Sequence, residues 1–295
     1  ILDISDNCPI DSNVSQSDAD SDGIGDPCDT DRDGDFITND DDSCPVTVNH
    51  PNTGRVAFFH GNNNLTESVT SATGTFVGGA AAYAPGIIGQ SYSLDGTEDY
   101  VEFSDSASWE LNSSHSTLSI WAYFNADEDG VLVGHSEGSG DTNKWALQYT
   151  NGTINFLNGS TGITAQEYLI YQFTPTLNHW HHFAITVNST GSTALYIDGS
   201  NATSVASFII QEISGPLTIG ASDNANFFNG RIDELEIFNR ELDSNEIAAL
   251  YSNWTQLDSD ADGQGDVCDS SPYPPTATPT PTNTSTSTQI GRAHV

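Results

Sequence analysis

The chain has 295 residues, and its 41 aspartates and glutamates face only 6 lysines and arginines, which gives a formal net charge of −35. This excess of negative charge argues against nucleic acid and anionic membrane surfaces as partners, because both would repel it. No run of 18 or more apolar residues occurs, so the sequence predicts no membrane insertion. The aspartates cluster at both ends with a fixed spacing, which indicates bound cations.

The first acidic segment, residues 1–49, contains the sharpest pattern. Counted from Asp18, side-chain oxygens fall at positions 1, 3, 5, 9 and 12, glycine stands at position 6, and Ile24 offers a backbone carbonyl at position 7. This is the spacing of a twelve-residue Ca²⁺ loop, in which alternate carboxylates curl around one ion and glycine allows the sharp turn. The predicted ligands are Asp18, Asp20, Asp22, Ile24, Asp26 and Asp29.

The same register recurs in two further places. In the copy that follows directly, Phe36 replaces the turn glycine, so we expect weaker binding or altered geometry. Its predicted ligands are Asp31, Asp33, Asp35, Ile37, Asn39 and Asp42. The copy near the C-terminal end has the predicted ligands Asp258, Asp260, Asp262, Gln264, Asp266 and Asp269. A solvated acidic run would show no common register, so Ca²⁺ is the expected cofactor.

Four cysteines accompany these loops: Cys8, Cys28, Cys44 and Cys268. Their even number favours disulfides in an oxidising, extracellular compartment. Zinc is the alternative, but no C-x-x-C pair is present and the neighbouring side chains are hard oxygen ligands.

At these residues a family resemblance emerges. The run from Asp6-Asn7-Cys8-Pro9 through Asn13 and Gln16 to the loop that ends at Cys28-Asp29 resembles the thrombospondin type-3 repeat. The resemblance covers about residues 1–49 and 253–270. It implies calcium ions wrapped by the chain and stapled by disulfides.

The repeat pattern is interrupted once. After Cys44 it runs to Asn49, stops, and resumes at Asn253, so we infer that residues 50–252 are a domain inserted within one repeat. The ends of such a domain should lie close together. Cys44 should then pair with Cys268, as Cys8 pairs with Cys28 in the uninterrupted copy. The alternative pairing, Cys28–Cys44, would leave Cys8 and Cys268 without partners.

The inserted region alternates short aromatic and β-branched runs with Gly, Asn and Ser turns, which predicts an all-β domain. About 200 residues suffice for a two-sheet core. A single helix is expected at residues 244–251, with Ser244 as its cap. Strands are expected at residues 117–124, 145–149, 183–187, 194–197, 217–219 and 232–238.

Five runs in this region resemble the laminin G-like, concanavalin A-like jelly roll, in the order of that family: residues 91–103, 117–121, 180–183, 195–199 and 228–240. The resemblance implies a two-sheet antiparallel jelly-roll sandwich, here flanked by irregular calcium-binding repeats. The family includes carbohydrate-binding, protein-binding and purely structural members. The expected partner is therefore a glycan or an extracellular matrix or cell-surface protein.

A further Ca²⁺ site in the jelly roll is expected at Asp95, Asp99 and Asp233, although as turn and sheet-end residues they could instead make local hydrogen bonds. Residues 181 and 182 open a strand and face opposite sides, so the histidines at 179, 181 and 182 are expected to be structural rather than metal ligands. The tryptophans at 121, 145 and 180 are expected in the core rather than as sugar platforms.

An enzyme is a further alternative, because glycoside hydrolases also use this fold. Glu234 and Glu236 have the i, i+2 spacing of two carboxylates on one strand face. The surrounding run does not match the Glu-x-Asp-x-x-Glu or Glu-x-Asp-x-Glu pattern of the hydrolases, so no catalysis is expected.

The C-terminal end is not expected to belong to a folded domain. Residues 271–289 form a Thr/Pro/Ser-rich linker, and residues 290–295 resemble a translated sequencing adapter. With no methionine in the chain, both natural ends are expected to be missing. The sequence predicts a calcium-binding extracellular adhesion or binding module. The alternatives are a carbohydrate-binding accessory region of a larger secreted hydrolase and a structural spacer.

Overall fold

The computed structural model of the chain describes residues 6–9, 13–20, 22–34, 39, 44, 51–111, 115–138, 142–159, 166–205, 210, 212–223 and 225–254. The strands are β1 (Arg55–Phe59), β2 (Thr75–Val77), β3 (Tyr83–Pro85), β4 (Gln90–Asp95), β5 (Tyr100–Phe103), β6 (Ser116–Phe124), β7 (Gly130–Ser136), β8 (Lys144–Thr150), β9 (Thr153–Gly159), β10 (Gln166–Gln172), β11 (Trp180–Val187), β12 (Thr193–Ile197), β13 (Ser200–Val205), β14 (Leu217–Ile219) and β15 (Asn229–Phe238). The helices are the 3-10 helix η1 (Ala107–Trp109) and the α-helix α1 (Ser244–Trp254).

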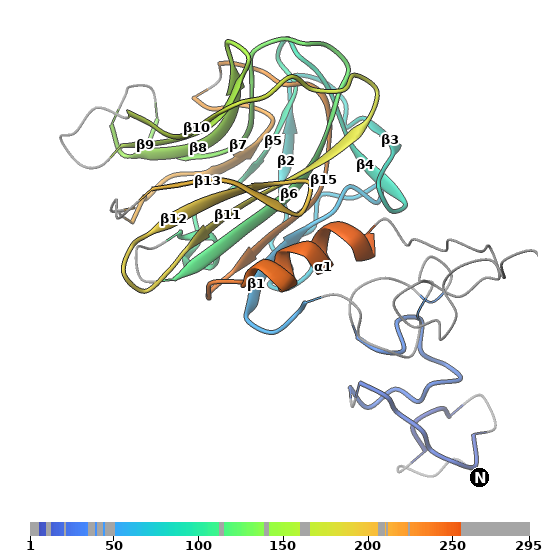
Figure 1. Cartoon of the computed structure of the whole chain (residues 1–295). Coiled ribbons are helices and arrows are strands. Elements are labelled where there is room, and N and C mark those ends of the chain that lie inside the picture. Colours follow the sequence, from blue (N-terminus) through green and yellow to red (C-terminus); the bar gives the residue numbers. More distant parts are fainter. Residues whose placement is uncertain are drawn as a thin grey trace, which may run out of the picture.

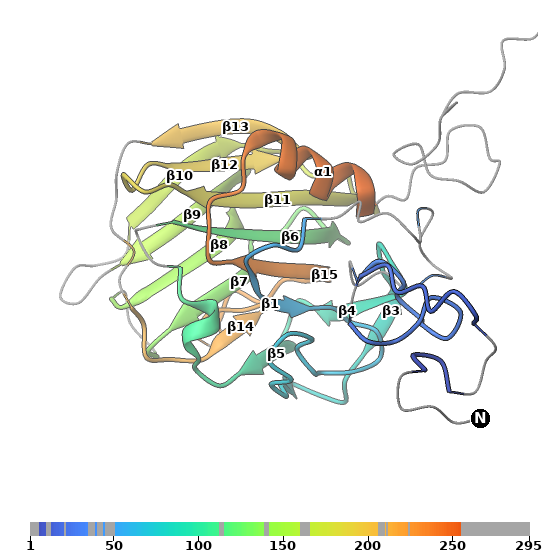
Figure 2. The same ribbon diagram turned by 90° about the horizontal axis from the view of Figure 1, so that it is seen from below.

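The strands form two antiparallel sheets that face each other as a jelly-roll sandwich (Figures 1 and 2). The first sheet has the order β13-β12-β11-β6-β15-β4-β3, and β1 also pairs with β15. β4 and β1 take successive halves of the same edge of β15. The second sheet has the order β10-β9-β8-β7-β14-β5-β2. The expected all-β fold class is confirmed.

The core lies between the sheets because alternate residues of each strand point inward. On β6, Leu118, Ile120 and Phe124 are fully buried in the main hydrophobic cluster. Ala122 belongs to the same cluster, whereas the odd-numbered residues Trp121 and Tyr123 lie on the outer face of the first sheet. Each expected strand is present, with its ends within three residues of the expected ones.

α1 packs on that outer face, beside β11 and β12 (Figure 2). Asp243 directly precedes α1, and its carboxylate accepts hydrogen bonds from the backbone N–H groups of Asn245 (2.8 Å) and Glu246 (3.0 Å). In return, the Glu246 carboxylate accepts a hydrogen bond from Asp243 N–H (2.9 Å). This reciprocal pattern is a capping box. The N-cap is therefore Asp243 and not the expected Ser244, and the helix continues beyond Tyr251 to Trp254.

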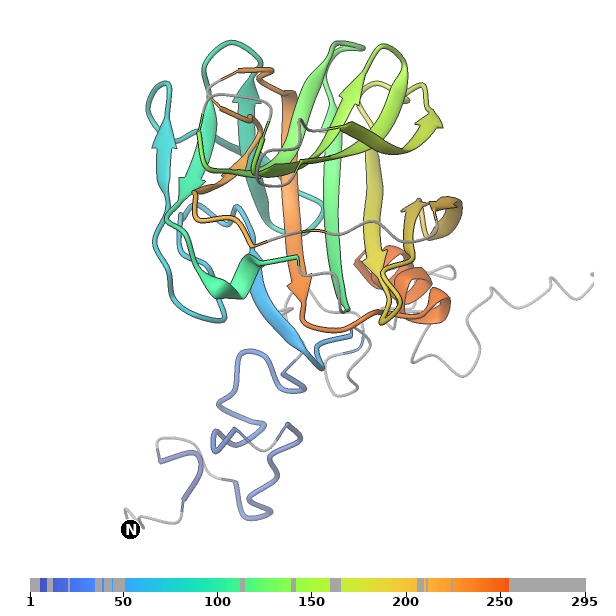
Figure 3. The ribbon, with the colours of Figure 1, turned by 90° about the vertical axis from the view of Figure 1, so that its left-hand side faces the viewer.

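The described residues before Pro51 form turns and bends, and this segment leaves the sandwich at one end (Figure 3). Cys8 and Cys28 form a disulfide, which excludes the alternative Cys28–Cys44 pairing. Cys44 is buried and disulfide-bonded. Its expected partner, Cys268, lies outside the described residues.

The chain enters the sandwich next to the segment that leads into α1. Asn239 N–H donates a hydrogen bond to Gly54 O (2.8 Å), and Arg240 Nε donates one to Thr53 O (2.6 Å). Among the described residues, no helix is both long and apolar enough to cross a membrane.

Candidate metal-binding loops and ligand pocket

The first acidic loop brings three of its predicted ligands together. One carboxylate oxygen from each of Asp18, Asp20 and Asp22 lies within 4.8 Å of the others. Gly23 has φ +98°, the left-handed conformation that the sharp turn at position 6 requires. Desolvation, followed by repulsion from Asp22 and Asp29, raises the pKa of Asp20. Since a cation would relieve this repulsion, the donor set fits a divalent metal ion.

The side chain at position 9 of each N-terminal loop closes the loop by accepting a hydrogen bond from the backbone N–H at position 2. Asp26 Oδ1 accepts a hydrogen bond from Ala19 N–H (2.9 Å), and Asn39 Oδ1 accepts the equivalent bond from Arg32 N–H (3.0 Å). The two loops thus share one register although Phe36 replaces glycine in the second. Sequence reasoning placed both residues as ligands and missed this bracing role.

The other predicted loop residues are partly described. Asp29 Oδ1 accepts a hydrogen bond from Asp31 N–H (2.9 Å) and so joins the first loop to the second. Asp33 is buried, and Ile24 is exposed. The predicted ligands that lie outside the described residues are Asp35, Ile37, Asp42, Asp258, Asp260, Asp262, Gln264, Asp266 and Asp269.

The three jelly-roll aspartates do not come together. Asp95 accepts hydrogen bonds from the hydroxyl (2.7 Å) and the N–H (2.8 Å) of Thr97, which lower its pKa. Burial, with repulsion from Asp95, raises the pKa of Asp99. Asp233 follows Asn229, the strand partner of Asp95, by four residues, which corresponds to about 13 Å along a strand. The register of β15 therefore separates Asp233 from the other two, which corrects the expectation of a shared site.

The histidines of β11 have structural hydrogen bonds. His182 is fully buried, and its Nε2 lies 2.8 Å from Ser119 Oγ. His181 Nε2 accepts a hydrogen bond from Thr176 N–H (3.1 Å), and its Nδ1 lies 3.1 Å from Asp198 Oδ2. The two rings face opposite sides of the strand, as expected.

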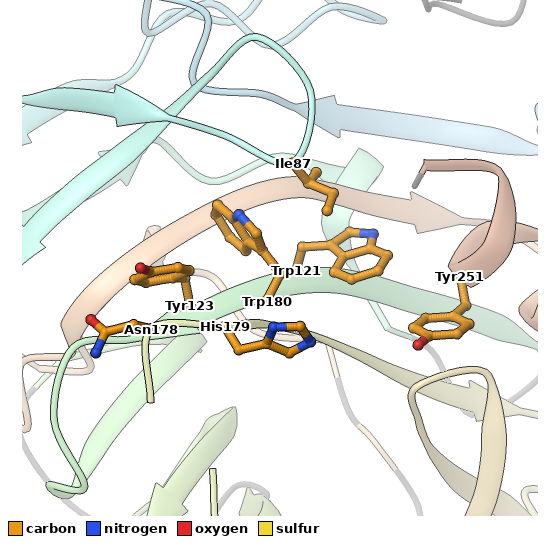
Figure 4. A pocket seen from close by; sticks show the side chains of 7 residues that line it. All are labelled: Ile87, Trp121, Tyr123, Asn178, His179, Trp180 and Tyr251. Atoms are coloured by element: carbon orange, nitrogen blue, oxygen red, sulfur yellow. The ribbon is translucent and has the colours of Figure 1, made fainter. Parts of the chain in front are cut away.

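A pocket lies on the outer face of the first sheet, between the β3–β4 hairpin and α1 (Figure 4). Its volume is about 190 Å³. The lining residues are Ile87 from the hairpin, Trp121 and Tyr123 from β6, Asn178 and His179 from the loop before β11, Trp180 from β11, and Tyr251 from α1.

Four aromatic rings form the walls of this pocket. Trp121 and Tyr251 are stacked, with ring centroids 5.6 Å apart and an interplanar angle of 15°. Tyr123 and Trp180 meet edge to face at 5.4 Å and 63°. The strand period explains the arrangement, because Trp121 and Tyr123 share one face of β6 and Trp180 is the strand partner of Tyr123.

The tryptophans therefore divide between two roles. Trp145 is fully buried in the main core, as expected. Trp121 is 1% exposed and Trp180 is half-buried, and both line the pocket. The signal that sequence reasoning missed was Trp-x-Tyr on one strand, since its meaning depends on which strand pairs beside it.

A second cavity adjoins the first at Tyr251, which lines both. It has a volume of about 560 Å³. Polar side chains of Asp198, Ser200, Asn245 and Ser252 lie along it. Ala248, Ala249 and Tyr251 line it as well, so its surface is mixed and mainly apolar.

The carboxylates of β15 do not form an accessible pair. Asp233, Glu234 and Glu236 are at most 1% exposed. Glu236 Oε2 accepts a hydrogen bond from Arg55 Nη1 (2.8 Å), and burial with repulsion from Asp233 raises the pKa of Glu234 well above its usual value. Hydrolysis of a glycoside needs two carboxylates on either side of the scissile bond, and these side chains are closed off from a substrate.

Two protein families match this sequence. Residues 95–248 match the concanavalin A-like lectin/glucanases superfamily, and residues 17–52 match the thrombospondin type 3 repeat. A segment of 44 residues is 54% identical to thrombospondin-3a of Danio rerio, and it covers 15% of this chain and 5% of that protein. The chain thus spans a small fraction of the length of that relative.

Solved structures share the fold of the sandwich. Domain 4 of AbnA, a GH43 extracellular arabinanase from Geobacillus stearothermophilus solved in complex with arabinotriose, has a TM-score of 0.56 and 22% identity, covering 67% of this chain and 98% of that chain. The ligand binding domain of botulinum neurotoxin serotype D, solved in complex with N-acetylneuraminic acid, has a TM-score of 0.55 and 18% identity, covering 72% and 54%. At these identities the likeness is one of fold.

Proposed function

Since the chain belongs to the concanavalin A-like lectin/glucanases superfamily and carries a thrombospondin type 3 repeat, we propose that it is an extracellular, non-catalytic binding module. Its jelly-roll head binds a glycan at the aromatic pocket, and its acidic loops bind Ca²⁺. The Cys8–Cys28 disulfide supports an oxidising compartment. The observation that carries the proposal is the pocket itself, with three aromatic rings from the outer face of one sheet and a fourth, Tyr251, from α1.

Sugar rings suit such a pocket because their C–H faces pack on aromatic rings while their hydroxyls need polar partners. Tyr123 and Trp180 offer half-buried rings, and the exposed Asn178 and His179 offer polar atoms beside them. The larger cavity beyond Tyr251 leaves room for a second sugar unit, with polar side chains such as Asp198 and Asn245 along it. A net charge of −35 disfavours acidic sugars, so the proposed ligand is a neutral oligosaccharide.

The acidic loops supply the calcium part of the proposal. Asp18, Asp20 and Asp22 would hold the ion of the first loop, and Asp26 would keep that loop closed. Bound Ca²⁺ supplies fixed positive charge that offsets the clustered carboxylates. We propose that residues 1–49 and 253–270 form one interrupted repeat array, which presents the inserted head at residues 50–252. The contact of Thr53 and Gly54 with the segment before α1 supports an insertion whose ends lie close together.

Experiment can also favour one of two other functions. A matrix or cell-surface protein could occupy the same pocket, and the chain could be a carbohydrate-binding accessory region of a larger secreted hydrolase. A catalytic domain encoded beside this segment would favour the accessory region. Binding to a matrix protein without binding to any glycan would favour the protein ligand.

The test is a glycan array followed by calorimetry on the calcium-loaded chain. We expect binding to a neutral oligosaccharide, and Trp180→Ala should weaken it about tenfold through loss of one stacking ring. The matched control is Tyr171→Ala, which removes an exposed ring from β10 of the other sheet. The absence of glycan binding, or equal losses for both variants, would overturn the assignment of this pocket.

A further inference from the structure

Three side chains of metal-binding type meet at an end of the second sheet, away from the acidic loops and the aromatic pocket. Asp105 follows β5, Glu110 follows η1, and His135 lies on β7. One ligand atom from each lies within 4.8 Å of the others. Neither the calcium loops nor the proposed glycan site uses these residues.

One ring nitrogen of His135 has a hydrogen-bond partner and the other has none among the described residues. The side chain is fully buried, and its Nε2 lies 2.8 Å from the backbone carbonyl of Gly215 and 3.5 Å from Asp105 Oδ1. Both neighbours of Nε2 are acceptors, so this nitrogen carries the proton. Nδ1 is buried with no hydrogen-bond partner among the described residues, and its lone pair lies 3.9 Å from Glu110 Oε1.

An unpartnered imidazole nitrogen facing a carboxylate is an arrangement that a cation completes. When Glu110 is ionised, Nδ1 and the carboxylate are two acceptors that do not attract one another, and a buried Nδ1 left without a donor is unfavourable. Burial, with repulsion from Asp105, raises the pKa of Glu110 to about 7.

The hydrogen bond on the other ring nitrogen has the form found at metal-bound histidines. Such a histidine usually donates its other ring N–H to a backbone carbonyl or a carboxylate, which fixes the tautomer and the ring orientation. His135 does so toward Gly215 O. Ile213 N–H, two residues before Gly215, donates to the Glu110 carboxylate at 3.2 Å and steadies the second ligand.

The ligand chemistry selects the metal. Ca²⁺ prefers an all-oxygen shell, whereas a site with one imidazole nitrogen and two carboxylates suits Zn²⁺. Bonds of about 2.1 Å in a tetrahedral shell place ligand atoms about 3.4 Å apart, so the group needs a small contraction. Asp105 supplies it by turning from the Nε2 side of the ring, where Oδ1 lies at 3.5 Å, toward Nδ1, and the 45% exposure of its side chain leaves room for that movement. The same exposure leaves a coordination position open to water.

We propose that Asp105, Glu110 and His135 form a Zn²⁺ site, distinct in position and ligand type from the calcium loops. The bound ion would tie the segment between β5 and η1 to the edge of β7. It would add a cross-link where the short strand β14 (Leu217–Ile219) pairs with β7.

The test is calorimetric titration of ZnCl₂ into the full chain saturated with Ca²⁺, so that the acidic loops are occupied. We expect one tight site per chain and a rise in melting temperature. Asp105→Asn and Glu110→Gln should each weaken this site at least tenfold. The matched control is Glu212→Gln, because Glu212 is exposed and adds to the repulsion on Glu110 without belonging to the group. It should leave zinc affinity within about twofold.

Each outcome decides the assignment. Co²⁺, used in place of Zn²⁺, should give the visible absorption of a four-coordinate ion in the parent chain and in Glu212→Gln, and lose it in Asp105→Asn. Zinc binding that survives Asp105→Asn and Glu110→Gln unchanged would place the metal elsewhere and overturn the proposal. The absence of zinc binding to the folded chain would overturn it too, and a proton held by Glu110 toward His135 would then account for the bare nitrogen.

Discussion

Gly34 of the second acidic loop lies directly against Asp20 of the first: a Cβ at Gly34 would lie 2.6 Å from Asp20 Oδ2. Asp20 is one of the three clustered carboxylates of the first loop. Gly34 also has φ +70°, a conformation that favours glycine. The two loops are therefore packed so closely that the backbone of one limits the ligand position of the other.

Gly34→Ala is expected to weaken calcium binding at the first loop, although the substituted residue belongs to the second. The added methyl group must push Asp20 out of the ligand cluster. The measurement is a calorimetric Ca²⁺ titration, in which we expect the affinity of at least one site to fall about tenfold or more. The control is Gly152→Ala, which has φ +75° and no atom within 4 Å of its Cβ position. If both variants bind Ca²⁺ equally, the packing has no effect on the loop.

Removal of Ca²⁺ is expected to separate the behaviour of the repeats from that of the sandwich. The sandwich has a continuous apolar core between its sheets, whereas the described part of the first loop is mostly aspartates and turns. Ions that bind only the folded repeats stabilise them by mass action. Calorimetric melting in EDTA should therefore lose or shift a low-temperature transition and leave the main transition nearly unchanged. A main transition that falls as far as the other would show that the two parts fold as one unit.

The sequence was most informative where the pattern is local. The register of the loop from Asp18 depends on a dozen consecutive residues, and the left-handed Gly23 follows from it. Strands such as β6 were found because β-branched and aromatic residues are dense between turn formers. β7 was missed, since Gly130 and Gly134 weaken the strand pattern within Gly130–Ser136.

The features that the sequence did not predict depend on strand pairing between residues far apart in the chain. Asp233 was expected beside Asp95, but the pairing of Asn229 with Asp95 places it four residues away. The pocket likewise depends on β11 lying next to β6 and on α1 bringing Tyr251 onto Trp121. No local rule gives those neighbours, so the tryptophans could be predicted as buried but not as members of one pocket.

The start of α1 gives a test in which the sequence and the structure make different predictions. Asp243 accepts two backbone hydrogen bonds at the N-terminus of the helix, so Asp243→Ala should lower the free energy of unfolding by about 1 kcal/mol. Because the helix carries Tyr251 into the pocket, glycan affinity should fall as well. Chemical denaturation and calorimetry measure the two effects.

Ser244→Ala is the paired control. Ser244 lies inside the helix and is not the cap in this structure, so its substitution should change stability by less than about 0.5 kcal/mol. A larger loss for Ser244→Ala than for Asp243→Ala would restore Ser244 as the cap.

Asp233 should make the sandwich less stable as the pH rises. The carboxyl group is fully buried, which raises its pKa to about 8, against about 3.9 in an unfolded chain. The folded state thus binds the proton more tightly, so the contribution of this group is complete below about pH 4 and is lost as the pH rises to about 8. Within this window the group lowers the free energy of unfolding by up to about 1.4 kcal/mol per pH unit.

Asp233→Asn removes this titration while it keeps the size of the side chain. Urea unfolding is measured at pH 5.5, 6.5 and 7.5 at constant saturating Ca²⁺. The free energy of unfolding should fall less steeply with pH than in the parent chain, by about 1.4 kcal/mol per pH unit, which corresponds to one proton. Glu234 still titrates in the variant, since its pKa is also raised, so the slope should fall without vanishing. Asp95→Asn is the control, because hydrogen bonds lower the pKa of Asp95 and any loss there occurs in acid, below this range. Parallel stability curves for the parent chain and Asp233→Asn would show that Asp233 is ionised in the folded protein throughout, and that its hydrogen bonds from Gly61 and Ile87 outweigh its burial.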